Sequence, residues 1–188
     1  MKHSGLKGGL IGMNRRQFLA SGGVTAASML AVAGCGVSEE ARGAGLTDPN
    51  IVPLRKTRDE WRALLTPAAY HVLFEDGTER PFSSLLNGEK RDGTYLCAAC
   101  RLPLFDARTK FVSGTGWPSF YQPIAGRLGT QQDWRLVFPR TEYHCARCGG
   151  HQGHVFDDGP EPTGRRWCNN GVALQFVAAG EKLPALRT

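Results

Sequence analysis

Two pairs of cysteines constrain the fold of this chain more than any other feature of its sequence. Each pair follows the pattern Cys-x-x-Cys, and the pairs are Cys97 with Cys100 and Cys145 with Cys148. A turn of this kind directs two thiolates at one point, and two such turns complete a tetrahedral set of ligands for zinc. The alternative is redox chemistry, in which each pair forms a disulfide, especially outside the cytosol. Because both pairs follow a short strand-like run, we favour a structural zinc site of four cysteines with no position left open for catalysis.

The composition favours a sheet-rich fold. The 188 residues include 24 glycines and 11 prolines, and frequent turns suit short strands better than a bundle of helices. The predicted strands cover residues 94–97, 104–106, 134–138, 141–145, 154–157, 165–170 and 172–177. Upstream, Thr57 and Glu60 match a capping box that starts a short helix over 57–65, and residues 68–74 can form a second turn of helix. The sequence predicts a mainly β domain with a short N-terminal helical segment.

The basic charge of the chain is concentrated near its N-terminus. The formal net charge is +6, but four basic residues and no acidic residue precede position 35, and the remainder carries 19 basic and 17 acidic side chains. A nearly neutral domain lacks the electrostatic footprint of a nucleic-acid-binding protein. We therefore expect no nucleic-acid partner.

The N-terminal residues are typical of an export signal. Arg15 and Arg16 precede Phe-Leu, which resembles a twin-arginine signal, and the apolar run over 18–34 is too short and polar to span a membrane. The run ends Val-Ala-Gly-Cys, which resembles a lipobox with Cys35 as the lipidated residue; cleavage near Ala33 with an incidental Cys35 is the alternative. We expect an exported, membrane-anchored lipoprotein with a signal (1–35), a flexible tether (36–54), a folded domain (55–180) and a C-terminal tail (181–188).

Cys168 is the only thiol left once Cys35 and the four paired cysteines are assigned. Alternation along an extended run over 165–170 places Arg166, Cys168 and Asn170 on one face. A guanidinium beside a thiol favours the thiolate, which is the reactive form of cysteine. The alternative is a small buried core residue, because free cysteine is often buried. The polar neighbours make a reactive thiol an equal candidate.

Two further features can supply a site around that thiol. His151 and His154 face opposite ways in a regular strand, but Gly153 permits a kink that brings both to one side, where each can donate a proton or serve as an ordinary structural histidine. Residues 111–120 place Trp117 on a small-residue loop before Pro118. Its indole suits a thioether or methyl group, and a core tryptophan that caps the sheet is the alternative.

Together these motifs resemble the MsrB-type peptide-methionine (R)-S-oxide reductases over residues 55–177. The segments that carry the resemblance are 61–67, 77–82, 97–100, 113–120, 145–148, 151–156, 158–160 and 166–170. The resemblance implies two antiparallel sheets, called a β-tent, with the four-cysteine zinc site away from the catalytic site. It also implies reduction of the R epimer of peptide-bound methionine sulfoxide to methionine.

The resemblance also implies a role for each site residue. Cys168 is the nucleophile and becomes a sulfenic acid, while His151, His154 and Asn170 surround the sulfoxide oxygen and supply a proton. Substrate contacts and support for the thiolate come from Trp117 against the methyl group, Phe156 in the pocket lining, Arg166 and Asp158. The chemistry agrees with the residue types, since a thiolate beside general acids is a pattern for nucleophilic catalysis.

The chain departs from that family at several positions. Thr115 stands where many members carry a resolving cysteine, so we expect a thioredoxin-like external reductant, with Cys35 on its tether as the alternative. Gln152 stands where leucine is usual, Trp167 stands where tyrosine or phenylalanine is usual, and Asn169 stands where an apolar residue is usual. Alternation along the strand turns residues 167 and 169 away from Cys168, so we expect these departures to alter packing and to leave activity in place. We expect a monomer. Two hypotheses compete with this one. The first is a zinc-stabilised binding module of the same fold without catalysis, and the second is a dithiol redox protein that uses the paired cysteines.

Overall fold

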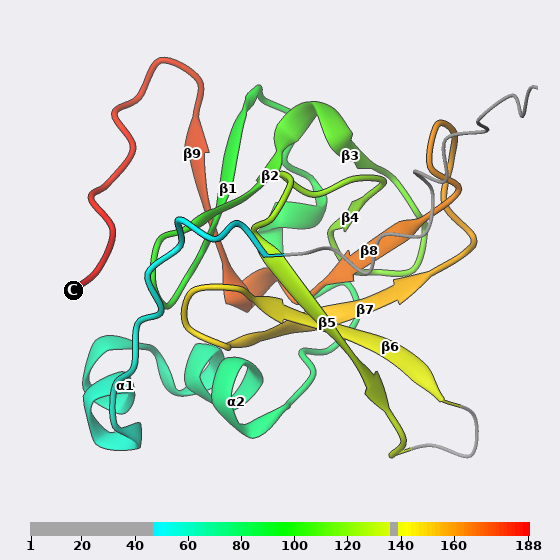
Figure 1. The fold of residues 1–188 in the computed structure, drawn as a ribbon. Helices are drawn as coiled ribbons and strands as arrows, with labels where there is room; N and C mark the ends of the chain where they lie inside the picture. Colours follow the sequence, from blue (N-terminus) through cyan, green and yellow to red (C-terminus); the bar gives the residue numbers. More distant parts are fainter. Residues whose placement is uncertain (1–46, 136–138) are drawn as a thin grey trace, which may run out of the picture. The chain divides into compact units, whose positions relative to one another are not determined.

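The computed structural model describes residues 47–135 and 139–188, and within them the chain forms two antiparallel sheets (Figure 1). One sheet has the order β2–β1–β9, with β1 at Gly93–Cys97, β2 at Pro103–Asp106 and β9 at Leu174–Ala178. The other has the order β3–β4–β8–β7–β6–β5. Its strands are β3 (Lys110–Phe111), β4 (Ser119–Phe120), β5 (Leu128–Asp133), β6 (Arg140–Cys145), β7 (His151–Phe156) and β8 (Arg166–Asn169). The predicted mainly β fold of two antiparallel sheets is confirmed.

Two short helices precede the sheets, as the sequence predicts. Helix α1 (Arg58–Leu64) begins after Thr57, whose hydroxyl accepts from the backbone N–H of Glu60 while the Glu60 carboxylate accepts from the backbone N–H of Thr57. This capping box satisfies two backbone donors that a helix start leaves open. Helix α2 (Pro67–Glu75) follows at once. Trp61 and Phe74 stack at 5.0 Å between ring centres, which holds the two helices together.

Aromatic rings join the two sheets into one core. Tyr95 and Phe105 come from the three-stranded sheet, and Phe120 and Tyr143 come from the six-stranded sheet; all four are fully buried. The rings of Phe105 and Phe120 stack at 4.1 Å, and Tyr95 meets the edge of Phe120 at 4.9 Å. Burying one such side chain contributes about 1.5–3 kcal/mol. The core therefore fixes the six-stranded sheet, whose central strands carry the predicted site.

Three predicted strands differ from the structure, and one of them, predicted over 154–157, is β7, which begins three residues earlier at His151. Strand β5 ends at Asp133, so residues 134–135 lie outside it, and residues 136–138 of the predicted strand lie outside the described residues. The chain turns there because the Asp133 carboxylate accepts from the backbone N–H of Arg135. The strand predicted over 172–177 begins at Leu174, because the 3-10 helix η3 (Gly171–Ala173) separates β8 from β9. The other short helices are η1 (Leu85–Asn87) and η2 (Ala107–Thr109).

The N-terminal predictions fall mostly outside the described residues. The signal over 1–35, including Cys35, and residues 36–46 of the predicted tether are not described. Residues 47–54 lie against the domain, where the backbone N–H of Leu54 donates to the Arg147 carbonyl at 2.7 Å and the side chains of Ile51 and Leu54 pack on the core. In the described part of the chain, no helix is both long and apolar enough to cross a membrane.

Candidate active site

A β-bulge in β7 brings the two histidines together. The partners of Gly153 and His151 on β6 are adjacent residues, so Gln152 is the extra residue of the bulge. An extra residue shifts the alternation of a strand by one, which places His151 and His154 on the same face. Their ring centres are 5.5 Å apart. The predicted kink is therefore present, and the inserted residue is Gln152.

Cys168 lies in the middle of β8 between two cross-strand neighbours. It pairs with Ser119 on β4 and with His154 on β7. Directly opposed side chains on antiparallel strands lie on the same face at about 5 Å between their Cβ atoms, so His154 is a side-by-side neighbour of the thiol. Gly153 allows this approach of β7 to β8, because a Cβ at that position would lie 1.9 Å from the Cys168 carbonyl oxygen.

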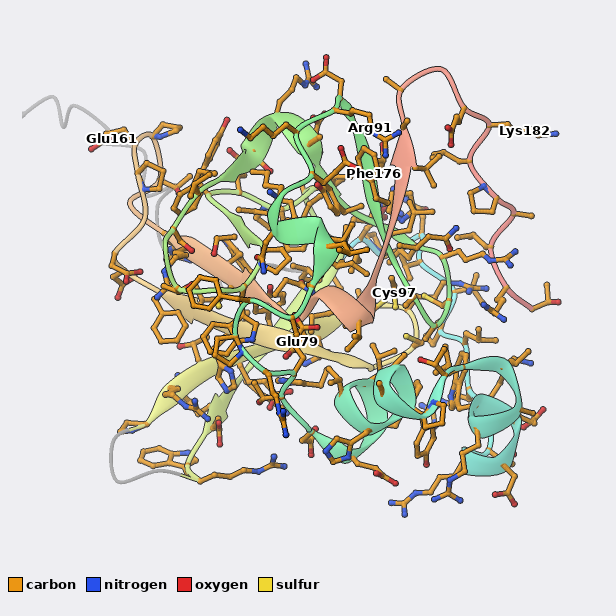
Figure 2. All side chains as sticks on the ribbon, turned by 180° about the vertical axis from the view of Figure 1, so that it is seen from behind. Glu79, Arg91, Cys97, Glu161, Phe176 and Lys182 are labelled. Atoms are coloured by element: carbon orange, nitrogen blue, oxygen red, sulfur yellow. The ribbon has the colours of Figure 1, made fainter. Side chains whose placement is uncertain are left out.

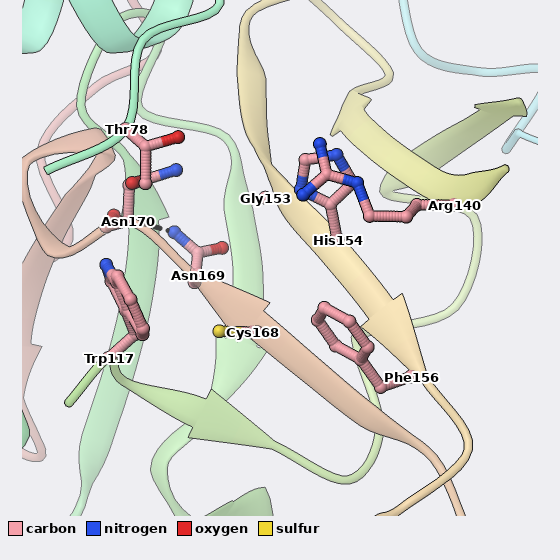
Figure 3. A pocket seen from close by; sticks show the side chains of 9 residues that line it. All are labelled: Thr78, Trp117, Arg140, Gly153, His154, Phe156, Cys168, Asn169 and Asn170. Atoms are coloured by element: carbon pink, nitrogen blue, oxygen red, sulfur yellow. Dashed lines mark hydrogen bonds between the residues drawn. The ribbon is translucent and has the colours of Figure 1, made fainter. Parts of the chain in front are cut away.

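The Cys168 thiol opens into a small pocket of about 120 Å³ (Figure 3). Trp117 and Phe156 stand on either side of the sulfur in this view and form apolar walls. The indole N–H of Trp117 donates to the Glu79 carbonyl at 3.2 Å, which fixes the plane of the ring. Trp117 is half-buried, so it forms a wall of the pocket and does not sit in the core. The remaining lining residues are Thr78, Arg140, Gly153, His154, Asn169 and Asn170.

Each histidine is held by a carboxylate. The Nε2 atom of His154 lies 2.9 Å from the Asp133 carboxylate, and the Nδ1 atom of His151 lies 2.8 Å from the Glu142 carboxylate. Burial lowers the pKa of His154, and the hydrogen bond with Asp133 opposes that effect. The pKa of Asp133 is lowered by the Arg135 backbone N–H and by its contact with His154. His154 is thus oriented by an ionised partner, while its Nδ1 stays chemically available.

Arg166 and Asp158 form a bidentate ion pair beside the pocket. The Arg166 Nε and Nη2 atoms donate to the two carboxylate oxygens of Asp158 at 2.8 and 2.9 Å, and the guanidinium lies 4.3 Å from the centre of the Phe156 ring. Burial raises the pKa of the Cys168 thiol, and the Arg166 charge and a hydrogen bond with the Thr115 side chain lower it. The Arg166 guanidinium lowers the pKa of Cys168, as predicted, but burial raises this pKa by more.

We expect replacement of Arg166 to move the ionisation of Cys168 to higher pH. Without the guanidinium, the burial that raises the pKa of Cys168 is less opposed. Only the thiolate reacts with iodoacetamide, so the rate of alkylation of Cys168 in Arg166→Gln should rise at higher pH than in the unmodified protein. Mass spectrometry of the Cys168 peptide separates this thiol from the others. Arg166→Lys keeps a charge and should shift the profile less; an unchanged Arg166→Gln profile would contradict this assignment.

The structure brings most of the sequence-predicted residues together. Cys168, His154, Asn170, Trp117 and Phe156 line one pocket. His151 is buried, with its ring centre 5.5 Å from that of His154, and it is not among the lining residues. Asp158 pairs with Arg166, while the histidines bond to Glu142 and Asp133. The Asn170 amide is already engaged, since its oxygen accepts from the Glu79 backbone N–H and its nitrogen donates to the Gln152 carbonyl. Asn170 therefore shapes the pocket from a fixed position.

Sequence reasoning missed several residues of this site. Thr78 and Arg140 line the pocket, and Asp133 and Glu142 hold the histidines. No local pattern marks these four residues, because strand register and loop packing bring them beside the histidines and the thiol. Thr115, one of the departures from the family, is among the groups that lower the pKa of Cys168.

The four paired cysteines form one cluster between the two sheets. The Sγ atoms of Cys97 and Cys148 are 3.6 Å apart, those of Cys100 and Cys145 are 3.5 Å apart, and all four lie within 4.8 Å of one another. A disulfide needs about 2.05 Å between sulfurs. Four thiolates at Zn–S distances of about 2.3 Å stand about 3.8 Å apart in a tetrahedron. The cluster is therefore a possible metal site of the kind predicted, and its geometry fits zinc.

Comparison with known proteins agrees with the geometry. The SelR domain model matches residues 65–178. Peptide methionine sulfoxide reductase MsrB of Methanosarcina mazei is 52% identical over 125 residues, which cover 66% of this chain and 89% of the relative. The protein of the same name from Pseudomonas putida strain GB-1 is 55% identical over 124 residues, covering 65% and 95%. Peptide methionine sulfoxide reductase B1, chloroplastic, of Arabidopsis thaliana is 50% identical over 123 residues, covering 65% and 61%.

The match of the SelR model covers more than half of the chain, and the relatives share their similarity with nearly the whole described domain. The folded domain with the Cys168 pocket therefore belongs to the SelR family, and this chain is a member of it, similar to the MsrB reductases as its motifs predict.

Proposed function

We propose that this protein reduces the R epimer of methionine sulfoxide in oxidised polypeptides to methionine, with Cys168 as the nucleophile. The observation that carries the proposal is the half-buried Cys168 thiol in a pocket with His154 as its cross-strand neighbour and Trp117 as an apolar wall. The methyl group of a sulfoxide fits against the indole, and its oxygen fits against the polar side of the pocket. A pocket that separates methyl, oxygen and lone pair selects one epimer.

The reaction transfers one oxygen atom. The Cys168 thiolate attacks the sulfoxide sulfur, a proton joins the sulfoxide oxygen, and the oxygen–sulfur bond of the substrate breaks. Methionine leaves, and the oxygen remains on Cys168 as a sulfenic acid, so the substrate sulfur is reduced by two electrons and the Cys168 sulfur is oxidised by two. The balance needs no other reactant in this half of the cycle.

His154 is the proposed proton donor. Its Nε2 faces Asp133 at 2.9 Å, so a donor directed at the substrate is the Nδ1–H of the protonated ring, a form that Asp133 favours and that burial disfavours. Arg140 lines the same pocket, and its guanidinium donates to the Asp133 carboxylate at 2.6 Å. A positive charge at this place stabilises negative charge that develops on the sulfoxide oxygen. His151, held by Glu142, orients the neighbouring ring.

An external dithiol of the thioredoxin class is the proposed reductant. Thr115, at the place of a resolving cysteine, supplies a hydroxyl to Cys168, and the other cysteines of the described residues are the four of the cluster. One thiol of the reductant attacks the sulfenic acid and releases water, and its second thiol then frees the Cys168 thiol as the reductant closes a disulfide. Each turnover therefore consumes one dithiol.

Zinc is the proposed occupant of the cysteine cluster. Cys97, Cys100, Cys145 and Cys148 would hold it, and a tetrathiolate zinc has no open position, so the ion would stabilise the fold and take no part in the reaction.

We propose further that the protein is a monomer, exported and tethered to a membrane by a lipid on Cys35. If so, Cys35→Ala should move the protein from the membrane fraction to the soluble fraction of fractionated cells.

A stereochemical assay tests the proposed reaction. The purified protein is incubated separately with the R and S epimers of N-acetylated methionine sulfoxide and dithiothreitol, and methionine formation is followed by chromatography. We expect reduction of the R epimer alone, because a pocket that places the methyl group against the indole of Trp117 and the oxygen against its polar side accepts one arrangement around the sulfur. Reduction of the S epimer would overturn the assignment. Absence of reduction for both epimers would favour the metal-stabilised binding module.

The surface beside the pocket supports a polypeptide substrate. Trp117 also lines a second groove, together with Phe82 and Val112, whose side chains are 72% and 83% exposed. Phe82 has a left-handed backbone with φ of 63°, and its backbone N–H donates to the Gly116 carbonyl at 2.7 Å, which fixes the loop that carries the exposed ring. Large exposed apolar groups beside a pocket favour contact with a partner chain.

Replacement of Phe82 should therefore affect peptides and spare free methionine sulfoxide. Loss of roughly 1 kcal/mol of apolar contact in Phe82→Ser raises KM about fivefold for a peptide with apolar residues next to the R sulfoxide. The KM for free methionine R-sulfoxide should not change. Leu85→Ser is a matched control, since Leu85 is 94% exposed and does not line the groove. An equal KM for the peptide in Phe82→Ser would exclude this contact.

A further inference from the structure

The bulge residue Gln152 connects the cysteine cluster to the strand of Cys168. Its side chain is fully buried, its Nε2 donates to the Cys97 sulfur at 3.5 Å, and its Oε1 accepts from the Asn169 Nδ2 at 3.3 Å. Its backbone carbonyl accepts from both the backbone N–H and the side-chain amide of Asn170, at 2.9 and 3.0 Å. One residue thus contacts a cysteine of the cluster on one side and the two residues after Cys168 on the other.

Asn169 completes the connection. It is fully buried, its Oδ1 accepts from the Tyr143 hydroxyl at 2.8 Å, and its Nδ2 also donates to the Asn170 carbonyl at 2.8 Å. Both amide groups of the Gln152–Asn169 pair are therefore satisfied inside the protein. A buried polar group without a partner costs about 1–3 kcal/mol, so the Gln152 Oε1 depends on Asn169, whereas Asn169 keeps Tyr143 and the Asn170 carbonyl as partners without Gln152.

Gln152 and Asn169 are polar residues at fully buried positions, where apolar side chains are the rule. In this chain the two polar residues meet each other and one thiol of the cluster. An apolar pair at these positions fills space without direction, whereas hydrogen bonds fix distance and orientation. The amide pair therefore adds a directional link that apolar packing does not provide.

We propose that Gln152 and Asn169 are positioning residues that tie the metal-bound Cys97 thiolate to the Cys168 strand, so that the geometry of the reactive thiol depends on the state of the cluster. The proposal rests on the proposed occupancy of the cluster by zinc. A thiolate on a metal accepts a stronger hydrogen bond than a thiol, and residues that bond to a metal ligand tune the affinity of the site. The link passes from Cys97 through Gln152 to Asn169 and Asn170, next to Cys168.

The first test is the strength of the metal site in Gln152→Met, which keeps the length of the side chain and removes its N–H donor. Release of zinc to a chromogenic chelator should be about 10–100-fold faster than from the unmodified protein. In cobalt-substituted protein, the thiolate-to-cobalt absorption band should shift in Gln152→Met. Gln122→Met, at an exposed loop position, is the control and should leave both unchanged. Release and spectrum identical to the unmodified protein would overturn the link to Cys97.

The second test follows the link to the reactive strand. Asn169→Leu keeps the Gln152 donor, so the cobalt band should stay in place while the rate of alkylation of Cys168 changes. The double variant Gln152→Met with Asn169→Leu leaves no stranded amide and should melt at a higher temperature than the sum of the two single losses predicts. If the losses of melting temperature in the two single variants simply add up in the double variant, the proposed coupling of Gln152 and Asn169 is wrong. An unchanged rate of Cys168 alkylation in Asn169→Leu would also overturn the proposal. These readouts need no reductase activity, so they fail or succeed independently of the proposed reaction.

Discussion

Cys168→Ser should lose at least about a thousandfold of its activity toward methionine R-sulfoxide, because removal of a nucleophile leaves only binding and electrostatic contributions. A serine hydroxyl stays protonated at neutral pH and lacks the soft sulfur that accepts the oxygen atom. The measurement is methionine formed from the R epimer with dithiothreitol in excess. The same variant should melt within a few degrees of the unmodified protein, since Cys168 is half-buried and outside the core.

Retained activity in Cys168→Ser would refute the assignment of the nucleophile. Activity lost together with the folded state would leave the loss unassigned, so the melting temperature is part of the result. Cys168→Ala serves as a second variant, because it removes the side chain without adding a hydroxyl. Equal loss in both variants, with both folded, places the effect on the sulfur atom.

Cys145→Ser should lower the melting temperature by about 8–16 °C. The Cys145 sulfur is fully buried, 3.5 Å from that of Cys100, and the cluster joins the ends of β1 and β6. Figure 2 shows Cys97 at the corresponding end of β1, seen from behind. We expect the free energy of unfolding to fall by about 4 kcal/mol, which is a fraction of the 10–16 kcal/mol that zinc binding contributes in zinc-finger peptides. For a domain of this size, that loss lowers the melting temperature by about 8–16 °C.

Metal content by atomic spectroscopy accompanies the melting curve. We expect about one zinc ion per unmodified chain and less than one in Cys145→Ser. Cys168→Ser is the matched control, because it removes a thiol that is not part of the cluster and should keep the full metal content. An unmodified chain without zinc, or a Cys145→Ser variant that melts as the unmodified chain does, would exclude a structural metal.

Local chemistry made several features predictable from residue order alone. Thr57 and Glu60 are three residues apart, which is the spacing that a capping box needs, and the box is present. The paired cysteines are close enough within each turn to share one ion. Asn169 is buried, as alternation along β8 predicts, but it also lines the pocket of Cys168. Each of these predictions depends on geometry within a few residues, which backbone dihedral preferences largely determine.

Features that depend on register across strands could not be predicted in this way. The strand predicted over 172–177 starts too early, because the backbone N–H groups of Gly171 and Val172 donate to the carboxylate of Glu79, about 90 residues earlier, and the chain turns there. The same residue holds the Trp117 indole through its carbonyl. No local pattern around position 171 reveals so distant a partner.

Residue order was therefore sufficient for the cysteine cluster, the helix start and the mainly β class, since each is a matter of short spacing or residue type. Only the folded arrangement shows that the carboxylates of Asp133 and Glu142 bond to the histidines, and that His151 is buried outside the pocket lining. It also shows that burial affects the pKa of Cys168 more than the charge of Arg166 does. Those outcomes depend on which strands lie side by side and how much water they exclude, and both arise only when segments far apart in the chain pack together.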